Sequence, residues 1–265
     1  MGGAITERPA GDESPYLSIV IPAYNEERRL PATLQRLHAY LCQRPYTWEI
    51  HVVSNGCTDD TDGVVRRAQA RIPNLHLTSV RERGKGLACK DGALRSRGQV
   101  IFLCDADLSM PPEELAGFIA MLDSADVVVG SREAPGAHRY REPWVRHLMG
   151  RGFNWLVRLL LVPGIRDTQC GFKAFRRAAA RELFGKQAVV GWGFDVELLF
   201  LARKRGCAVR ELPIDWYFDA DTRVRPGVDS LRMVGEVILV RLADALGVYR
   251  SRAATPGTRR EDIAR

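Results

Sequence analysis

The stretch Ile101-Phe-Leu-Cys-Asp105-Ala-Asp107-Leu-Ser-Met-Pro-Pro-Glu joins an apolar run to two carboxylates one residue apart. The apolar residues predict a buried strand, and Ser-Met-Pro-Pro-Glu predicts that a helix begins soon after it. Open α/β sheets bind ligands at the carboxyl ends of their strands, where both aspartates stand. Carboxylate oxygens are ligands that Mg²⁺ and Mn²⁺ prefer, so we expect Asp105 and Asp107 to bind one of these ions. The same short pattern also occurs in solvated loops. Other motifs in the chain are therefore needed to distinguish a metal site from a loop.

The composition is that of a globular chain with one large core. Of its residues, 46% are hydrophobic and 27% are charged, which argues against extended disorder. Residues 1–15 predict a flexible N-terminal tail and residues 250–265 a flexible basic tail, around a single domain at 16–249. The net charge of +7 favours acidic partners such as phosphorylated substrates or anionic lipid, although a solvated basic surface explains it equally well.

The cysteines and the apolar runs bear on the cellular compartment. The six cysteines form no C-x-x-C pair and show no zinc-like spacing to histidine, which is typical of reduced thiols in a cytoplasm. The N-terminus shows no signal peptide pattern, and charged residues interrupt each apolar run before it reaches the length of a bilayer span. We therefore expect a cytoplasmic protein without a transmembrane segment.

Strands and helices alternate along the first half of the chain. Short apolar runs predict strands at 17–22, 48–54, 75–79, 100–104 and 126–130. Helical periodicity predicts helices at 26–41, 59–71 and 113–122, and a further helix that opens in Gly84-Lys85-Gly86. This alternation predicts an α/β fold, a doubly wound and mostly parallel sheet with helices on both faces.

The second half changes character. Residues 143–162 combine aromatic and aliphatic side chains with arginines in an amphipathic segment. Such a segment is either a core helix with a solvated back or a helix that lies on a membrane surface, and periodicity does not separate the two. Further helices are expected at 194–205 and 229–247, with a strand at 209–214 between them.

An ordered set of motifs gives a specific resemblance. The motifs are Val20-Ile-Pro-Ala-Tyr-Asn-Glu-Glu27, Val53-Ser-Asn-Gly-Cys-Thr-Asp-Asp-Thr61, Arg83-Gly-Lys-Gly86 and Asp105-Ala-Asp107. In this order they resemble a family 2 glycosyltransferase of GT-A fold. Three later motifs resemble dolichyl-phosphate β-glucosyltransferases and their bacterial polyprenyl-phosphate relatives: Val129-Gly-Ser-Arg132, Gly164-Ile-Arg-Asp-Thr-Gln-Cys-Gly-Phe-Lys173 and Gly193-Phe-Asp-Val-Glu197. The resemblance implies a nucleotide-sugar half at 16–130 and an acceptor half with amphipathic helices at 131–249.

On the donor side, the resemblance implies a set of residues that hold the nucleotide sugar. They are Pro22, Ala23, Tyr24, Glu26, Asn55, Lys85, Asp105 and Gln169. The backbone of Gly84 and Gly86 is expected beside phosphate or ribose together with Lys85, because a helix N-terminus binds anions. The family commonly has aspartate where Asn55 stands. Asn55 accepts a hydrogen bond without carrying a charge, so the choice between UDP and GDP stays open.

On the acceptor side, a lipid phosphate is the expected nucleophile. Its second pKa of about 6 means that it is already ionised and needs cationic positioning more than a strong base. The resemblance implies that Arg132, Arg146 and Lys173 bind this phosphate, and Arg146 alternatively lies on a solvated helix face.

Two pairs of acidic residues complete the predicted site. Asp167 and Asp107 are expected to be the catalytic carboxylates, and the alternative for Asp167 is an aspartate that caps a turn. Asp195 and Glu197 fall on opposite sides of a helix, so at most one of them faces the site, and we favour Glu197.

The sequence therefore predicts a metal-dependent, inverting transfer of a hexose to a polyprenyl or dolichyl phosphate. Glucose from UDP-glucose is favoured, with Mg²⁺ or Mn²⁺ as cofactor and peripheral contact with the inner face of the membrane. A GDP-mannose-dependent mannosyltransferase, a soluble transferase that acts on a sugar or small alcohol, and a non-catalytic nucleotide-sugar-binding module remain as alternatives. Nucleic acid is not an expected partner because the basic residues are dispersed. No G-x-G-x-x-G follows the first strand, which argues against a dehydrogenase. The sequence indicates no oligomeric state.

Overall fold

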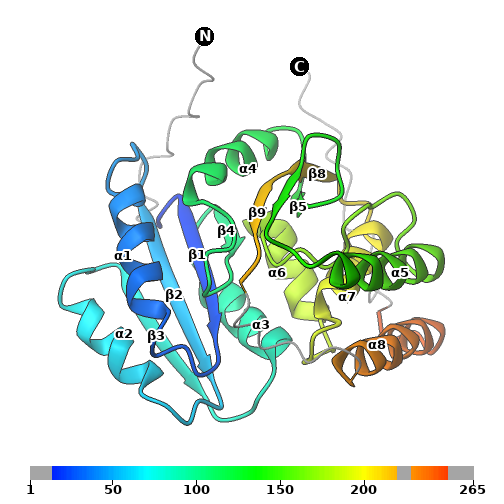
Figure 1. Cartoon of the computed structure of the whole chain (residues 1–265), viewed down its shortest axis with the longest axis horizontal. Coiled ribbons are helices and arrows are strands. Elements are labelled where there is room, and N and C mark those ends of the chain that lie inside the picture. The colour runs from blue at the N-terminus through cyan, green and yellow to red at the C-terminus, as the bar shows by residue number, and fades with distance from the viewer. Residues whose placement is uncertain (1–13, 220–227, 250–265) are drawn as a thin grey trace, which may run out of the picture.

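The computed structural model describes residues 14–219 and 228–249, which form a mixed sheet with helices on both faces (Figure 1). The strands of this sheet are β1 Leu17–Ala23, β2 Trp48–Asn55, β3 Leu75–Val80, β4 Val100–Leu103, β5 Val127–Ser131, β7 Lys173–Arg176 and β8 Val209–Pro213. The helices are α1 Leu30–Leu41, α2 Thr61–Gln69, α3 Lys85–Arg95, η1 Pro112–Glu114, α4 Leu115–Met121, α5 Trp144–Leu160, α6 Arg177–Lys186, α7 Phe194–Lys204 and α8 Val228–Ala245. The strand order is β3-β2-β1-β4-β7-β5-β8.

The strand order reverses between β3 and β4. Strands β1, β2 and β3 run outward to one edge in parallel, and β4 then returns to pair with the other side of β1. Because parallel crossovers are right-handed, α1 and α2 cover one face and α3 covers the other, where it packs on β1 and β2. Sheets of this type bind ligands where the order reverses, here at the carboxyl ends of β1 and β4.

Strand β7 explains why distant motifs meet. It runs antiparallel to both neighbours, β4 and β5. Its first residue, Lys173, therefore lies at the edge where β4 and β5 end. The loops after β4 and β5 and the loop before β7 come together at this edge, although they are far apart in the sequence.

The core makes these strands a rigid platform. All residues of β4 and β5 are buried, as expected for central strands with helices on both faces. Phe102 on β4 packs edge-on against Phe118 of α4, with ring centroids 5.1 Å apart. Helix α7 is buried from Phe194 to Ala202 on every side, including Asp195 and Glu197. Charged residues inside such a helix need partners within the protein.

Beside the main sheet, β6 (His138–Tyr140) and β9 (Asp215–Tyr217) form a two-stranded parallel ribbon. Stacking of Tyr140 on Tyr217, with centroids 4.5 Å apart, stabilises it. Among the residues that the structure describes, no helix combines the length and the apolar character needed to cross a bilayer.

The predicted fold class is confirmed, with differences in detail. Helix α1 begins at Leu30 and not at Glu26, because residues 26–29 form a turn in which the Arg29 N–H donates to the Glu26 carbonyl, and Pro31 occupies the first turn of the helix. Neither β7 nor α6 was predicted. The four residues of β7 carry no alternating pattern that sequence reasoning detects. The division at residue 130 and the tails stay predictions.

Candidate active site

The loop after β4 brings the predicted metal ligands to the reversal point of the sheet. Asp105 lies 2.6 Å from the ammonium of Lys85, the first residue of α3. Asp107 accepts a hydrogen bond from the backbone N–H of Ser109 at 3.0 Å. Leu108, which directly follows Asp107, has a φ of +47°. This left-handed conformation is energetically unfavourable for a residue with a side chain, and such conformations are concentrated at functional sites. The loop is thus held in a shape that keeps both carboxylates at the strand end.

The electrostatics of this loop leave negative charge in excess. Burial and the neighbouring Asp105 raise the pKa of Asp107 above its usual range. Burial alone would lower the pKa of Lys85, but Asp105 and Asp195 outweigh it and keep the ammonium protonated. Asp195 is also paired with Lys173 at 2.6 Å, so two lysines face three carboxylates, and Asp105 and Asp107 share Lys85. Oxygen ligands with uncompensated charge suit a hard divalent cation, so the residues present fit Mg²⁺ or Mn²⁺.

Gly171 makes room for Asp105. A Cβ atom at this position would lie 2.1 Å from Oδ2 of Asp105, so any side chain would displace the carboxylate. The backbone of the loop before β7 therefore lies directly against the carboxylate of the loop after β4, and a side chain at position 171 would force this carboxylate to move. The sequence motif at 164–173 predicts no role for Gly171.

Asp195 belongs to the site and Glu197 does not, so the preference for Glu197 is wrong. Asp195 lies 2.6 Å from the ammonium of Lys173, and burial raises the pKa of its carboxyl. Glu197 instead accepts hydrogen bonds from the backbone of Ala188 and Val189. Because both carboxylates are buried in α7, periodicity alone gave no means to tell which one faces the strand ends.

Lys173 lies beneath the surface of the site. Its side chain is fully buried, and its ammonium donates to the Cys170 carbonyl as well as to Asp195. The site thus contains a row of five charged side chains, in which Lys85 acts on both Asp105 and Asp195 and Lys173 pairs with Asp195: Asp107, Asp105, Lys85, Asp195 and Lys173. Lys173 holds Asp195 in this row; its predicted phosphate contact stays a prediction.

Arg132 and Asp167 form a closed pair at the ends of β5 and of the loop before β7. The guanidinium donates to both carboxylate oxygens at 2.7 and 3.0 Å, and the backbone N–H of Arg132 adds a third bond at 3.0 Å. Burial alone would raise the pKa of Asp167, but Arg132 lowers it to about 2. Such a carboxylate is a weak base that fixes a guanidinium firmly in place.

The predicted nucleoside residues surround the end of β1. Pro22 and Ala23 end the strand, and Tyr24 follows half-buried with the Arg83 guanidinium 4.0 Å from its ring centre. Glu26 is 5% exposed and pairs with Arg29 at 2.6 Å. These residues lie together as the motif predicts, and their contact with a nucleoside stays a prediction.

Asn55 and the start of α3 lie against each other. The side-chain amide of Asn55 donates to the Gly84 carbonyl at 3.1 Å, which leaves an acceptor role to its carbonyl oxygen. The N–H groups of Gly86 and Leu87 donate to the carbonyls of Gly191 and Val190. The N–H of Gly86 is thus used within the protein, and the expected approach of the Gly84 and Gly86 backbone to phosphate or ribose stays a prediction. Lys85 remains the cation of this turn.

Two further predicted residues lie on neighbouring elements. The Gln169 backbone N–H donates to Asp167 at 3.2 Å, and its side chain lies beside Met233 of α8. Arg146 is in the first turns of α5, and its side chain is outside the described ones. Both assignments stay predictions.

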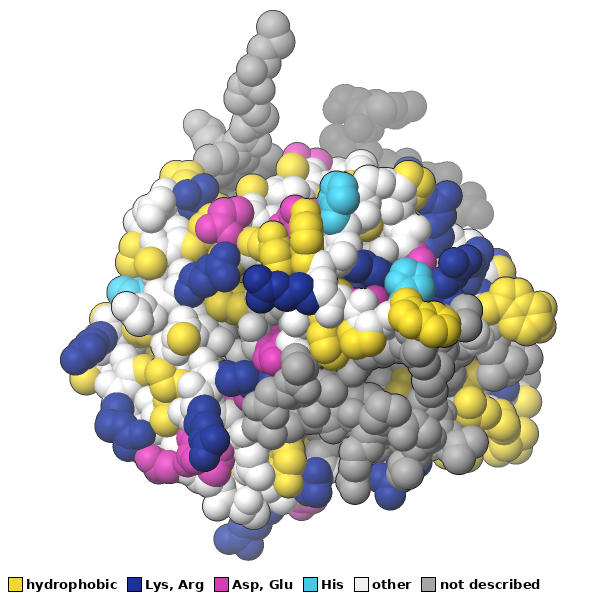
Figure 2. All heavy atoms as spheres, in the orientation of Figure 1, with side chains coloured by type: hydrophobic (Ala, Val, Ile, Leu, Met, Phe, Trp, Pro, Cys, Tyr) yellow, Lys and Arg dark blue, Asp and Glu magenta, His cyan; other side chains and the backbone are white. Residues whose placement is uncertain are grey.

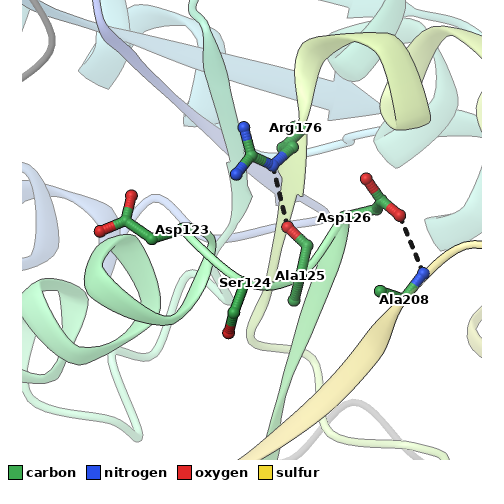
Figure 3. Close-up of a pocket in the computed structure, with 6 residues that line it drawn as sticks. All are labelled: Asp123, Ser124, Ala125, Asp126, Arg176 and Ala208. Carbon is green, nitrogen blue, oxygen red and sulfur yellow. Dashed lines mark hydrogen bonds between the residues drawn. The ribbon is translucent and has the colours of Figure 1, made fainter.

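A hollow at the opposite ends of the strands, where β5 and β8 begin, is not part of this site. Its lining comes from the starts of β5 and β8 and the end of β7: Asp123, Ser124, Ala125, Asp126, Arg176 and Ala208 (Figure 3). Arg176 donates to the Ala125 carbonyl and Asp126 accepts from the Ala208 N–H. These polar groups bond to one another and serve the fold.

Comparison with known proteins agrees with this geometry. The description "Glycosyl transferase family 2" matches residues 18–184. A dolichyl-phosphate β-glucosyltransferase of Trichomonas vaginalis is 34% identical over 91% of this chain and 76% of its own length. The human dolichyl-phosphate β-glucosyltransferase is 34% identical over 88% and 77%. Among solved structures, glucosyl-3-phosphoglycerate synthase from Mycobacterium tuberculosis in complex with Mn²⁺, UDP and glucosyl-3-phosphoglycerate superposes with a TM-score of 0.63 at 20% identity, over 85% and 80% of the two chains.

Proposed function

The chain belongs to glycosyl transferase family 2 and is a glycosyltransferase of GT-A fold, and we propose that it transfers glucose from UDP-glucose to a polyprenyl phosphate such as dolichyl phosphate. The observation that carries the proposal is the excess negative charge of the loop after β4, where the carboxylates of Asp105 and Asp107 share one lysine, Lys85. That loop suits a divalent cation and a nucleoside diphosphate. The names of the relatives support the sugar and the acceptor.

The donor side has to stabilise a departing diphosphate. Transfer breaks the bond between the anomeric carbon and the diphosphate, which takes the electron pair and gains negative charge. A divalent cation held by Asp105 and Asp107 would act there as a Lewis acid. Lys85 adds a fixed positive charge, because its ammonium stays protonated in this surrounding.

The acceptor side has to place an anion. A phosphate oxygen that attacks the anomeric carbon opposite the diphosphate inverts the configuration in one displacement, with no covalent intermediate on the enzyme. Arg132 is the proposed partner of this phosphate, together with Arg146. Asp167 positions Arg132, since a carboxyl with a pKa of about 2 does not withdraw protons effectively and an ionised acceptor needs no base.

We further propose that α5 and α8 rest on the membrane that contains the lipid substrate. Large apolar side chains on these helices are exposed, among them Trp144, Trp155, Leu159, Leu239 and Leu242. Figure 2 shows hydrophobic side chains at the end of the molecule where Figure 1 draws both helices. Tryptophan is typical of membrane interfaces, and arginines on the same helices suit anionic headgroups.

The deciding experiment measures the sugar that enters lipid. Purified protein is given radiolabelled UDP-glucose or GDP-mannose, polyprenyl phosphate and Mg²⁺ or Mn²⁺, and label is counted in the organic phase. We expect label from UDP-glucose, lost on addition of EDTA and in Asp107→Asn. The matched control is Asp91→Asn, which changes a carboxylate paired with Arg95 on the surface of α3.

Each other outcome selects another function. Label from GDP-mannose indicates the mannosyltransferase. Release of UDP without label in lipid indicates a soluble acceptor. Binding of both donors without turnover indicates a nucleotide-sugar-binding module.

Membrane contact has its own test. Sedimentation with vesicles of phosphatidylcholine and phosphatidylglycerol should carry the protein into the pellet. The double change Trp155→Glu and Leu159→Glu should leave it in the supernatant, whereas Ala116→Glu on the exposed side of α4 should not. Equal sedimentation of all three proteins would overturn the assignment of this surface.

A further inference from the structure

Three ionisable side chains meet near the beginning of β2 and β3. Glu49 and His51 are two residues apart on β2, so their side chains project from the same face of the sheet. His76 stands opposite His51 in the parallel register of β2 and β3. The two imidazole rings stack with centroids 4.7 Å apart, and one ligand atom from each of the three side chains lies within 4.8 Å of the others.

The cluster is buried, yet one of its polar atoms has no hydrogen bond. Glu49 is 2% exposed and His51 is 8% exposed. Nε2 of His51 is buried without a hydrogen-bond partner, although Oε1 of Glu49 is 3.2 Å away. Nε2 of His76 lies 3.7 Å from the other oxygen of the same carboxylate. A buried polar atom that lacks a hydrogen bond is costly, and this one faces two further ligand atoms.

We propose that Glu49, His51 and His76 form a binding site for a transition-metal ion, with Zn²⁺ as the preferred ion. Two imidazoles and one carboxylate are a ligand set that zinc accepts, and at bond lengths of about 2.0–2.2 Å its tetrahedral ligands lie about 3.3–3.6 Å apart. Nε2 of His51 lies 3.2 Å from Oε1 and Nε2 of His76 lies 3.7 Å from Oε2, so each imidazole is close to this separation from one oxygen of the shared carboxylate. The His76 side chain is 43% exposed, which gives water access to the fourth position.

Neighbouring groups orient the carboxylate. The Ser18 hydroxyl donates to Oε1 of Glu49 at 2.6 Å, and the backbone N–H of Arg97 donates to the same oxygen at 2.7 Å. Outer hydrogen bonds of this kind fix ligating carboxylates in metal sites. The Arg97 guanidinium lies 3.4 Å from Oε2, but 65% of its side chain is exposed. The Arg97 guanidinium can therefore move into solvent when a metal ion binds to Glu49.

The site is separate from the loop after β4. Glu49 precedes Asn55 by six residues, about 20 Å along an extended strand. The chemistry differs too, because imidazole favours zinc whereas two carboxylates favour Mg²⁺ or Mn²⁺. An ion here joins the edge strand β3 to β2, so its expected effect is on the stability of this edge and not on sugar transfer.

Cobalt titration tests the proposal, because Co²⁺ reports tetrahedral coordination by visible absorption. The full chain is stripped with a chelator and kept in excess Mg²⁺, which occupies oxygen sites. We expect one equivalent of Co²⁺ to bind, to be displaced by Zn²⁺, and to bind at least tenfold more weakly to His76→Ala. Zn²⁺ should also raise the melting temperature of the unaltered protein but not that of the variant.

The matched control is His38→Ala. Nε2 of His38 lies 3.3 Å from Sγ of Cys42 at the end of α1. These two side chains are an alternative pair of ligands for Co²⁺ or Zn²⁺. Unchanged binding by His38→Ala supports the proposal. Three results overturn it: no binding by the unaltered protein, full binding by His76→Ala, or loss of binding in His38→Ala.

Discussion

Two loops at the same edge of the sheet each carry a partly or fully buried aspartate, and their electrostatic situations are opposite. In the loop after β4, burial and Asp105 raise the pKa of Asp107. In the loop before β7, Arg132 lowers the pKa of Asp167 to about 2 against the effect of burial. The first loop has excess negative charge that can bind a cation from solution. In the second loop, the Arg132 guanidinium already neutralises the carboxylate. The difference distinguishes Asp107, a carboxylate available to bind a metal ion, from Asp167, a carboxylate that positions Arg132.

The largest expected effect follows from removing the uncompensated charge. Asp107→Asn should lower the transfer rate on the order of 1,000-fold, because a metal supplies several kcal/mol of transition-state stabilisation. Stability should be unchanged or higher, since repulsion with Asp105 is relieved. Initial rates at saturating Mg²⁺ and thermal melting measure the two effects. Loss of activity together with a lower melting temperature would contradict the comparison.

A loss of stability is expected when Asp167, whose charge is neutralised by Arg132, is removed. Asp167→Ala should lower the free energy of unfolding by about 3 kcal/mol, because it leaves Arg132 buried without its counter-ion. This is the lower end for buried pairs, since 21% of the Arg132 side chain is exposed. Urea unfolding measures it. The double change Arg132→Met and Asp167→Leu should recover stability but not transfer, whereas recovery of transfer would show that Arg132 does not hold the acceptor.

Acid titration sharpens the same contrast. The folded pKa of Asp167 lies below its unfolded value, so its contribution is present above about pH 4 and is lost as the pH falls towards 2. A shift from 3.8 to about 2 corresponds to about 2 kcal/mol. Glu49 is also held at a pKa of about 2 and contributes to the same acid transition. Asp167→Asn should therefore flatten the pH dependence of unfolding without abolishing it. An unchanged curve would contradict the assigned pairing.

The sequence was informative where chemistry follows a strand directly. Asp105, Asp107 and Lys85 were predicted from their place at a strand end and a helix start, and they lie together. Asp195 was missed because it reaches the site through Lys173, a buried contact between α7 and β7 that no local pattern encodes. The pairing of Arg132 with Asp167 likewise depends on an antiparallel strand whose four residues give no sequence signal.

The smallest expected effect concerns the place where the two loops touch. Gly171→Ala puts a Cβ atom in steric conflict with Oδ2 of Asp105, so the carboxylate has to turn away from the cation. We expect the concentration of Mg²⁺ needed for half-maximal transfer to rise on the order of tenfold, the size of effect typical of groups that orient a ligand. The matched control is Gly185→Ala on α6, where a Cβ meets nothing within 4 Å. If both variants need the same Mg²⁺ concentration, the two loops do not communicate through this contact, and Asp105 and Asp107 bind the cation independently of the acceptor half.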